Sequence, residues 1–118
     1  MLIRNERFRV TFDRLEPAAM VKFYDQKFEA RFPGFPPFSD RGMLLGAYTG
    51  LFKTQATLQF TKTTIVRLAP RRYRTHNKFL VTEFRKSGTS TRTGTITLTW
   101  QFRRATPFIV LDETVANH

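Results

Sequence analysis

Two tyrosines and one aspartate are the side chains whose types could act on a small molecule: Tyr24, Tyr48 and Asp112. A tyrosine hydroxyl can orient a carbonyl group, and an inward-facing carboxyl group can act as an acid or as a hydrogen-bond donor. The alternative for both tyrosines is a place in the hydrophobic core, which aromatic residues at helical spacing commonly occupy. We therefore treat the three as candidate catalytic residues.

Asp112 has an acidic neighbour, Glu113, on the last strand that the sequence predicts. Consecutive side chains of a strand point to opposite faces, so at most one of the two can face inward. The alternative for either carboxylate is an ion pair with an arginine such as Arg67 or Arg103.

A basic run lies in a predicted turn between strands, over Pro70 to Asn77. The candidate anion-binding residues at this turn are Arg71, Arg72, Arg74, His76 and Lys78. They could clamp a phosphate or a carboxylate, with Tyr73 stacked on a ring. The alternative is a charged loop tip that is merely solvated.

The whole chain is basic, with 20 Lys and Arg against 9 Asp and Glu and a formal net charge of +11. Such a surface attracts polyanions, although the same charge also keeps a protein dispersed. Cysteine is absent, which excludes disulfides and thiolate metal sites. The two histidines have no ligand spacing, and GxGxxG, GxxxxGK and GxSxG are all missing. We therefore expect no metal and no cofactor.

Length and composition fit one globular domain over residues 1–118. No run is long and apolar enough to span a membrane, and the charged N-terminus does not resemble a secretory signal. We expect a cytoplasmic protein without membrane insertion.

Helices are expected in the first half of the chain. Apolar residues recur at three- and four-residue spacing and Pro17 interrupts them, which predicts helices over Asn5 to Arg14 and Glu16 to Tyr24. A short edge strand then leads into a proline-rich loop over residues 32–37.

A third helix is expected after Ser39 and Asp40, which have the side chains of a helix cap. Gly46 and Gly50 are poor helix formers, and we expect them to let this helix lie close to a sheet.

The second half is rich in Thr, Val, Ile and Phe and predicts four strands. Their expected ranges are Thr57 to Leu68, Lys78 to Lys86, Gly94 to Arg103 and Pro107 to Thr114, with turns over Pro70 to Asn77, Ser87 to Arg92 and Arg104 to Thr106. In the third strand, apolar residues that include Trp100 alternate with a polar row of Thr95, Thr97, Thr99 and Gln101. Helices followed by an antiparallel meander predict an α+β fold.

These patterns resemble the nuclear transport factor 2-like (SnoaL-like) superfamily. The word FYDQKF at residues 23–28 is similar to a tyrosine-rich word of that superfamily, and GTITLTWQFRRATPFIVLDET resembles its last hairpin. Over residues 8–114 the resemblance implies a cone-shaped, curved antiparallel sheet with about three N-terminal helices packed on its concave face. It also implies an apolar cavity between the two layers.

The resemblance implies where ligands and partners would bind. The candidate ligand contacts are Tyr24, Tyr48, Phe52, Trp100 and Asp112. Related domains commonly form homodimers through the outer face of the sheet. In catalytic relatives a carboxylate base precedes a proline in the loop that corresponds to residues 30–38. Here Phe32, Phe35 and Pro36 hold those positions, so that carboxylate is missing.

Three functions remain open. The first is a non-catalytic module, expected by the resemblance to be a dimer, that binds a small apolar ligand or a partner. The second is a SnoaL-like acid–base enzyme, such as an isomerase, cyclase or hydrolase, on a small apolar substrate. The third is a polyanion-binding domain. A buried carboxylate or histidine on the cavity wall would distinguish the second from the first.

Overall fold

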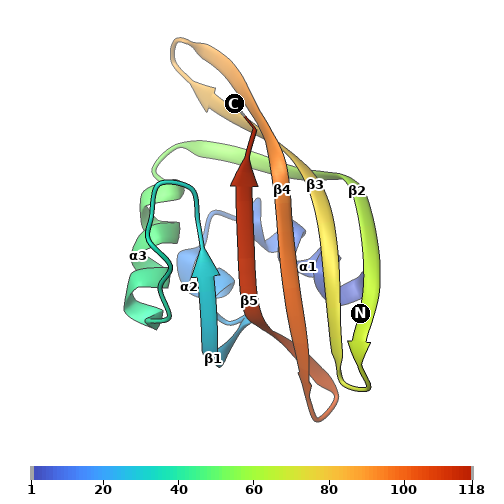
Figure 1. Cartoon of the computed structure of the whole chain (residues 1–118). Coiled ribbons are helices and arrows are strands. Elements are labelled where there is room, and N and C mark those ends of the chain that lie inside the picture. Colours follow the sequence, from blue (N-terminus) through green and yellow to red (C-terminus); the bar gives the residue numbers. More distant parts are fainter. Residues whose placement is uncertain (1, 118) are drawn as a thin grey trace.

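The computed structural model describes residues 2–117, which form three helices and one five-stranded sheet (Figure 1). The helices are α1 (Leu2–Phe12), α2 (Pro17–Val21) and α3 (Arg41–Leu51); the strands are β1 (Tyr24–Arg31), β2 (Gln55–Ala69), β3 (Arg72–Arg85), β4 (Gly88–Arg103) and β5 (Thr106–Ala116). The helices lie on one side of the sheet, which confirms the predicted α+β class.

The sheet has the strand order β1-β5-β4-β3-β2. Strands β2 to β5 form the predicted antiparallel meander, whereas β1 pairs with β5 in parallel. The edge strand therefore makes the sheet mixed. The turn between β3 and β4 extends beyond the other strands, near the end of the chain (Figure 1).

The predicted second helix was too long at its C-terminal end. Helix α2 stops at Val21, and Tyr24 already belongs to β1. The backbone carbonyl of Phe23 accepts a hydrogen bond from the Ile109 amide at 2.8 Å, and Tyr24 is in register with Ile109. Pairing with β5 therefore draws this segment out of the helix, and tertiary contact overrides the apolar periodicity.

Two of the predicted turns were also too long. Strands β2 and β3 are separated only by Pro70 and Arg71, and β3 and β4 only by Lys86 and Ser87. The basic residues after Arg71 alternate with inward side chains such as Thr75 and Asn77, which are fully buried. Charge on one face does not interrupt a strand whose other face is buried.

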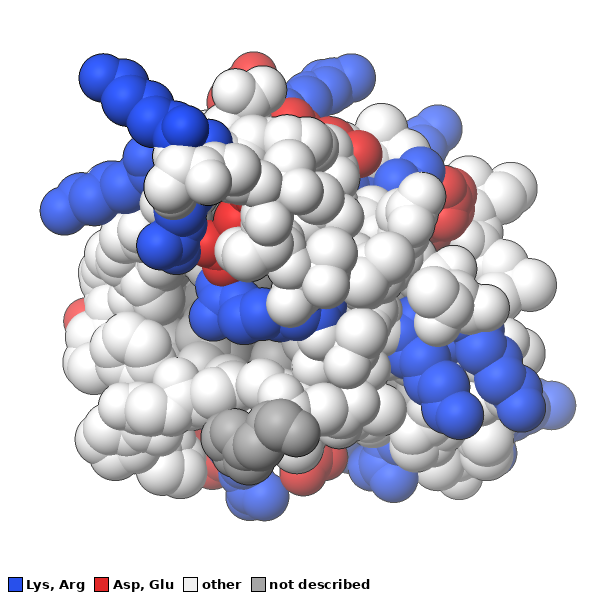
Figure 2. Space-filling model, turned by 90° about the horizontal axis from the view of Figure 1, so that it is seen from above, with Lys and Arg blue, Asp and Glu red and all other residues white. Residues whose placement is uncertain are grey.

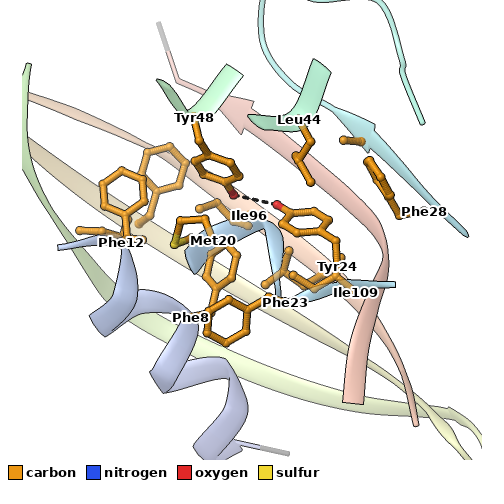
Figure 3. Packing of buried hydrophobic residues seen from close by; sticks show 14 of the residues in the cluster. Phe8, Phe12, Met20, Phe23, Tyr24, Phe28, Leu44, Tyr48, Ile96 and Ile109 are labelled. Atoms are coloured by element: carbon orange, nitrogen blue, oxygen red, sulfur yellow. Dashed lines mark hydrogen bonds between the residues drawn. The ribbon is translucent and has the colours of Figure 1, made fainter. Parts of the chain in front are cut away.

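Aromatic side chains pack in part of the space between the helices and the sheet. The Phe8 and Phe23 rings meet edge to face with centroids 5.6 Å apart, and the Phe12 and Phe52 rings do so at 5.0 Å. Each fully buried side chain of this kind contributes about 1.5–3 kcal/mol. This packing holds α1 against the segments that follow α2 and α3, and the same hydrophobic core joins it to the sheet (Figure 3).

A buried polar cluster fixes α1 on the sheet. The Asn5 side chain donates to Oδ1 of Asn77 at 2.8 Å and accepts from the Thr75 hydroxyl at 2.9 Å. The Trp100 indole N–H donates to Thr75 Oγ1 at 3.0 Å. Since buried polar groups need partners, these bonds specify how α1 lies across the strands.

Among residues 2–117, no helix is both long enough and apolar enough to cross a membrane.

Candidate functional site

A cavity of about 530 Å³ opens between α3, the proline-rich loop, α1 and the inner face of the sheet. Its wall is largely aromatic and contains Phe8, Phe12, Phe32, Phe35, Phe38 and Phe79. Ile96 and Val81 contribute the aliphatic floor. A space of this size and polarity suits a small organic molecule that is mostly apolar.

Two glycines on α3 keep this cavity open. Gly46 and Gly50 lie one helical turn apart and both line it. A Cβ built at either position meets nothing within 4 Å, so the expected close approach of helix to sheet was wrong. The glycines instead leave empty volume where side chains would project into the cavity. The predicted cap of this helix is confirmed, because the Asp40 carboxylate accepts from the Met43 amide at 3.2 Å.

Four polar side chains form one hydrogen-bonded cluster at the cavity wall, and three of them, Tyr48, Asp112 and Thr114, line the cavity. The Tyr24 hydroxyl donates to Asp112 Oδ2 at 2.5 Å and lies 2.7 Å from the Tyr48 hydroxyl (Figure 3 shows the two tyrosines). The Thr114 hydroxyl donates to Asp112 Oδ1 at 2.9 Å. Both oxygens of the carboxylate therefore have a donor. Strand β5 presents Asp112 and Thr114, β1 presents Tyr24, and α3 presents Tyr48.

Burial sets the protonation of this cluster. It raises the pKa of Asp112 to about 6, although hydrogen bonds from Tyr24 and Thr114 act in the opposite direction. Burial and the nearby Asp112 charge raise the pKa of Tyr24 and Tyr48 well above the usual value of tyrosine. Both hydroxyls therefore remain protonated, while Asp112 can change its charge near neutral pH.

The structure brings together three of the five predicted ligand contacts. Tyr48 and Asp112 line the cavity, and Tyr24 lies directly behind them on the same hydrogen-bond chain. Phe52 is half-buried and packs on Tyr48 and on α1, outside the cavity lining. Trp100 is fully buried beneath α1 and does not reach the cavity either.

The side chains of the two neighbouring acids point to opposite faces of the sheet, as the strand alternation predicted. Asp112 faces inward, and its side-chain partners are hydroxyl groups rather than an arginine. Glu113 faces outward and forms an ion pair with Arg31 at 3.4 Å. Arg103 pairs with Asp25 at 3.0 Å. Thr114 was not among the predicted site residues, although its position two residues after Asp112 places it on the same face.

The predicted anion-binding residues are arranged differently from the expected loop. Arg72, Arg74, His76 and Lys78 form a row along β3, on the face of the sheet opposite the helices; we call it the β3 basic row. Only Arg71 lies in the turn. On the next strand the polar row faces the same side: Arg72 Nε donates to Gln101 at 2.9 Å, and Arg74 Nε donates to the Thr99 hydroxyl at 3.2 Å.

Within residues 2–117, no group of three or more His, Cys, Asp or Glu side chains is placed to hold a metal ion.

No family model matches the sequence, and no curated protein does. Solved structures do match. A candidate dehydratase of the nuclear transport factor 2-like family from Streptomyces avermitilis has a TM-score of 0.84 at 11% identity, over 98% of this chain and 93% of its own. A candidate scytalone dehydratase from Novosphingobium aromaticivorans has 0.84 at 10%, over 98% and 80%. The beta subunit of the benzoate 1,2-dioxygenase from Burkholderia mallei has 0.83 at 12%, over 98% and 87%.

At these identities the likeness shows the fold alone. The chain has the nuclear transport factor 2-like fold, as the sequence patterns predicted.

Proposed function

We propose that this protein binds a small, largely apolar molecule in the cavity, with a polar group of that molecule against Tyr48, Asp112 and Thr114. The observation that carries the proposal is the open, aromatic-walled space of about 530 Å³ with a hydrogen-bonding cluster on one wall. Apolar area supplies affinity in such sites, and a few placed polar groups supply orientation.

The pH would decide whether the Tyr48 hydroxyl accepts a hydrogen bond from the ligand or donates one to it. With Asp112 ionised, Tyr24 donates to the carboxylate and Tyr48 donates to Tyr24, which leaves the Tyr48 oxygen as an acceptor. With Asp112 protonated, the direction of the chain can reverse, so that Tyr48 donates. Above pH 6 the site therefore prefers ligands that carry an O–H or N–H group. Below pH 6 it prefers carbonyl compounds.

Filling the cavity tests the proposal. Gly46→Leu adds a side chain that starts in empty space, because a Cβ at this position meets nothing within 4 Å, and leucine favours the helix over glycine by roughly 0.8 kcal/mol. The probe is the neutral dye N-phenyl-1-naphthylamine, followed by fluorescence titration. We expect saturable binding to the native protein and at least about tenfold weaker binding to Gly46→Leu.

The matched control is Thr49→Leu, which adds the same side chain to an exposed position of α3 outside the cavity lining. Its affinity for the dye should stay close to that of the native protein. Absence of binding to the native protein, or equal binding to all three proteins, would refute the cavity as the site.

A second candidate function is acid–base catalysis on a bound carbonyl compound. The observation in its favour is a buried carboxylate on the cavity wall with a pKa of about 6. In this reaction Asp112 removes a proton from the carbon next to the carbonyl and returns one to the same carbon. A positioned base of this kind accelerates proton transfer by roughly 10²–10⁴-fold.

Deuterium exchange distinguishes catalysis from binding. In D₂O, the native protein should incorporate deuterium at carbon 1 of 2-tetralone faster than the Asp112→Asn variant does, as measured by proton NMR. If the exchange rates are equal with both proteins and the native protein binds the dye, the protein binds ligands in the cavity but does not catalyse this reaction.

A further inference from the structure

One basic side chain, Arg92, is part of the cavity lining formed by residues 2–117. It lies on β4 and shares the inner face of that strand with Gly94 and Ile96, because side chains two residues apart point the same way. Its side chain remains more than half exposed, so it stands where the cavity meets solvent. Figure 2 shows a hollow in this face with Lys or Arg side chains, and Asp or Glu atoms next to them, at its edge.

A buried carboxylate holds Arg92 in this place. Glu83 on β3 is only 5% exposed and accepts hydrogen bonds from both Arg92 and Arg85. The bond from Arg85 and the charge of Arg92 lower the pKa of Glu83, so it remains ionised at neutral pH. One carboxylate shared by two guanidinium groups leaves a net charge of +1 at this rim.

The guanidinium of Arg92 still has donors to offer. Arginine carries five N–H groups in a fixed fork, and the contact with Glu83 uses NH2 of that fork. The fork geometry suits the two oxygens of a carboxylate. The apolar wall excludes water from one side of this cation, while the other side, more than half of the side chain, stays exposed to solvent.

The two polar parts of the cavity lie far apart. Asp112 is in register with Leu98, which is six residues along β4 from Arg92. At about 3.3 Å per residue, the separation along the strand is up to about 20 Å. An anion at Arg92 is therefore kept away from the like charge of Asp112, with the aromatic wall between them.

We infer that Arg92 is an anion-binding subsite, and that the ligand of this cavity is an elongated apolar molecule with one carboxylate. The inference rests on the proposed function and names the chemical class of its ligand. The carboxylate meets Arg92 at the mouth, the apolar part lies along the aromatic wall, and the polar group of the proposed function lies at the other end, against Tyr48 and Asp112.

Paired probes of equal shape test the inference. The probes are 6-phenylhexanoate and its neutral analogue 6-phenylhexanamide, titrated by calorimetry at pH 8. A charge-assisted contact predicts about tenfold tighter binding of the carboxylate to the native protein. Arg92→Gln should remove this preference and leave the affinity for the amide nearly unchanged.

Arg85→Gln is the matched control, because Arg85 pairs with the same Glu83 but does not line the cavity. It removes the same charge and should keep the preference for the carboxylate. Each single variant leaves Glu83 one arginine partner, and thermal unfolding of both checks that the fold is retained. Arg92→Lys, which keeps the charge and loses the fork, should keep part of the preference.

The outcomes separate the two claims. If neither probe binds the native protein, the proposed function fails. If both probes bind equally well, or if Arg92→Gln and Arg85→Gln reduce the preference to the same extent, the cavity binds apolar molecules without an anion subsite at Arg92.

Discussion

At the scale of single residues, burial decides what Asp112 can do. A carboxylate exposed on a strand titrates near 3.9, whereas the one on the cavity wall has its pKa raised to about 6. Two hydroxyl donors keep it from rising further. The native protein therefore binds a proton at this site more tightly than the unfolded chain does, and the stability of the protein is linked to that proton.

The linkage gives a prediction about stability and pH. Because the native pKa is raised, the contribution of Asp112 is fully present below about pH 4 and is lost as the pH rises through 6. Two pKa units correspond to about 2–3 kcal/mol. We expect the free energy of unfolding of the native protein to fall by this order between pH 4 and 7.5, relative to that of Asp112→Asn, as measured by urea denaturation.

Taking the difference between the two proteins removes the opposite contributions of Asp25 and Glu83, whose pKa values are lowered by arginine partners. A difference that does not change with pH would show that Asp112 does not titrate in this range.

The candidate cluster was largely predictable from residue types. Tyr24 and Tyr48 were predicted from their hydroxyl groups and Asp112 from an inward-facing carboxyl group on the last strand, and hydrogen bonds join the three. The cavity itself was not predictable in the same way. Glycine lowers helix propensity at any position, so the sequence alone could not tell whether Gly46 lets the helix approach the sheet closely or leaves a cavity beside the helix. Only the position of α3 relative to the sheet decides that.

At the scale of elements, the β3 basic row gives one strand a strongly basic outer face. Strand boundaries were the weakest part of the sequence prediction here, since Arg72 to Asn77 carries enough charge to suggest a loop. The alternation of Arg74 and His76 with the buried Thr75 and Asn77 was the available signal, and the high polarity of both faces concealed it. Regularly spaced cations on a rigid strand are a better match to a polyanion than a mobile turn would be.

Polyanion binding by this row stays a prediction, and salt dependence tests it. The probe is a fluorescein-labelled 30-mer of thymidylate, and the readout is fluorescence anisotropy. If about three side chains neutralise phosphates, the affinity should fall roughly twentyfold between 50 and 200 mM salt. The triple variant Arg72→Gln, Arg74→Gln, Lys78→Gln should lose most of the binding.

A second triple variant controls for net charge. Arg7→Gln, Arg14→Gln, Lys22→Gln removes the same number of exposed cations from the helical side of the molecule. It should bind nearly as well as the native protein. Binding that stays flat from 50 to 200 mM salt, or equal losses in both triple variants, would exclude the row as the site.

At the scale of the whole molecule, the same row bears on self-association. The sequence patterns led to the expectation of a homodimer through the outer face of the sheet, where the polar side chains of β4 lie beside the β3 basic row. A two-fold interface places the same surface on both sides, so two copies of the row would approach each other. Like charges brought together at an interface oppose association, and salt screens them.

Dimerisation through this face should therefore strengthen with salt, contrary to the binding of a polyanion by the same face. We expect sedimentation equilibrium to give a smaller dimer dissociation constant at 500 mM than at 50 mM sodium chloride. The triple variant of the row should dimerise as well at low salt as the native protein does at high salt. A dimer whose affinity is independent of salt in both proteins would have to use another face, and that result would leave the β3 basic row free for an anionic partner.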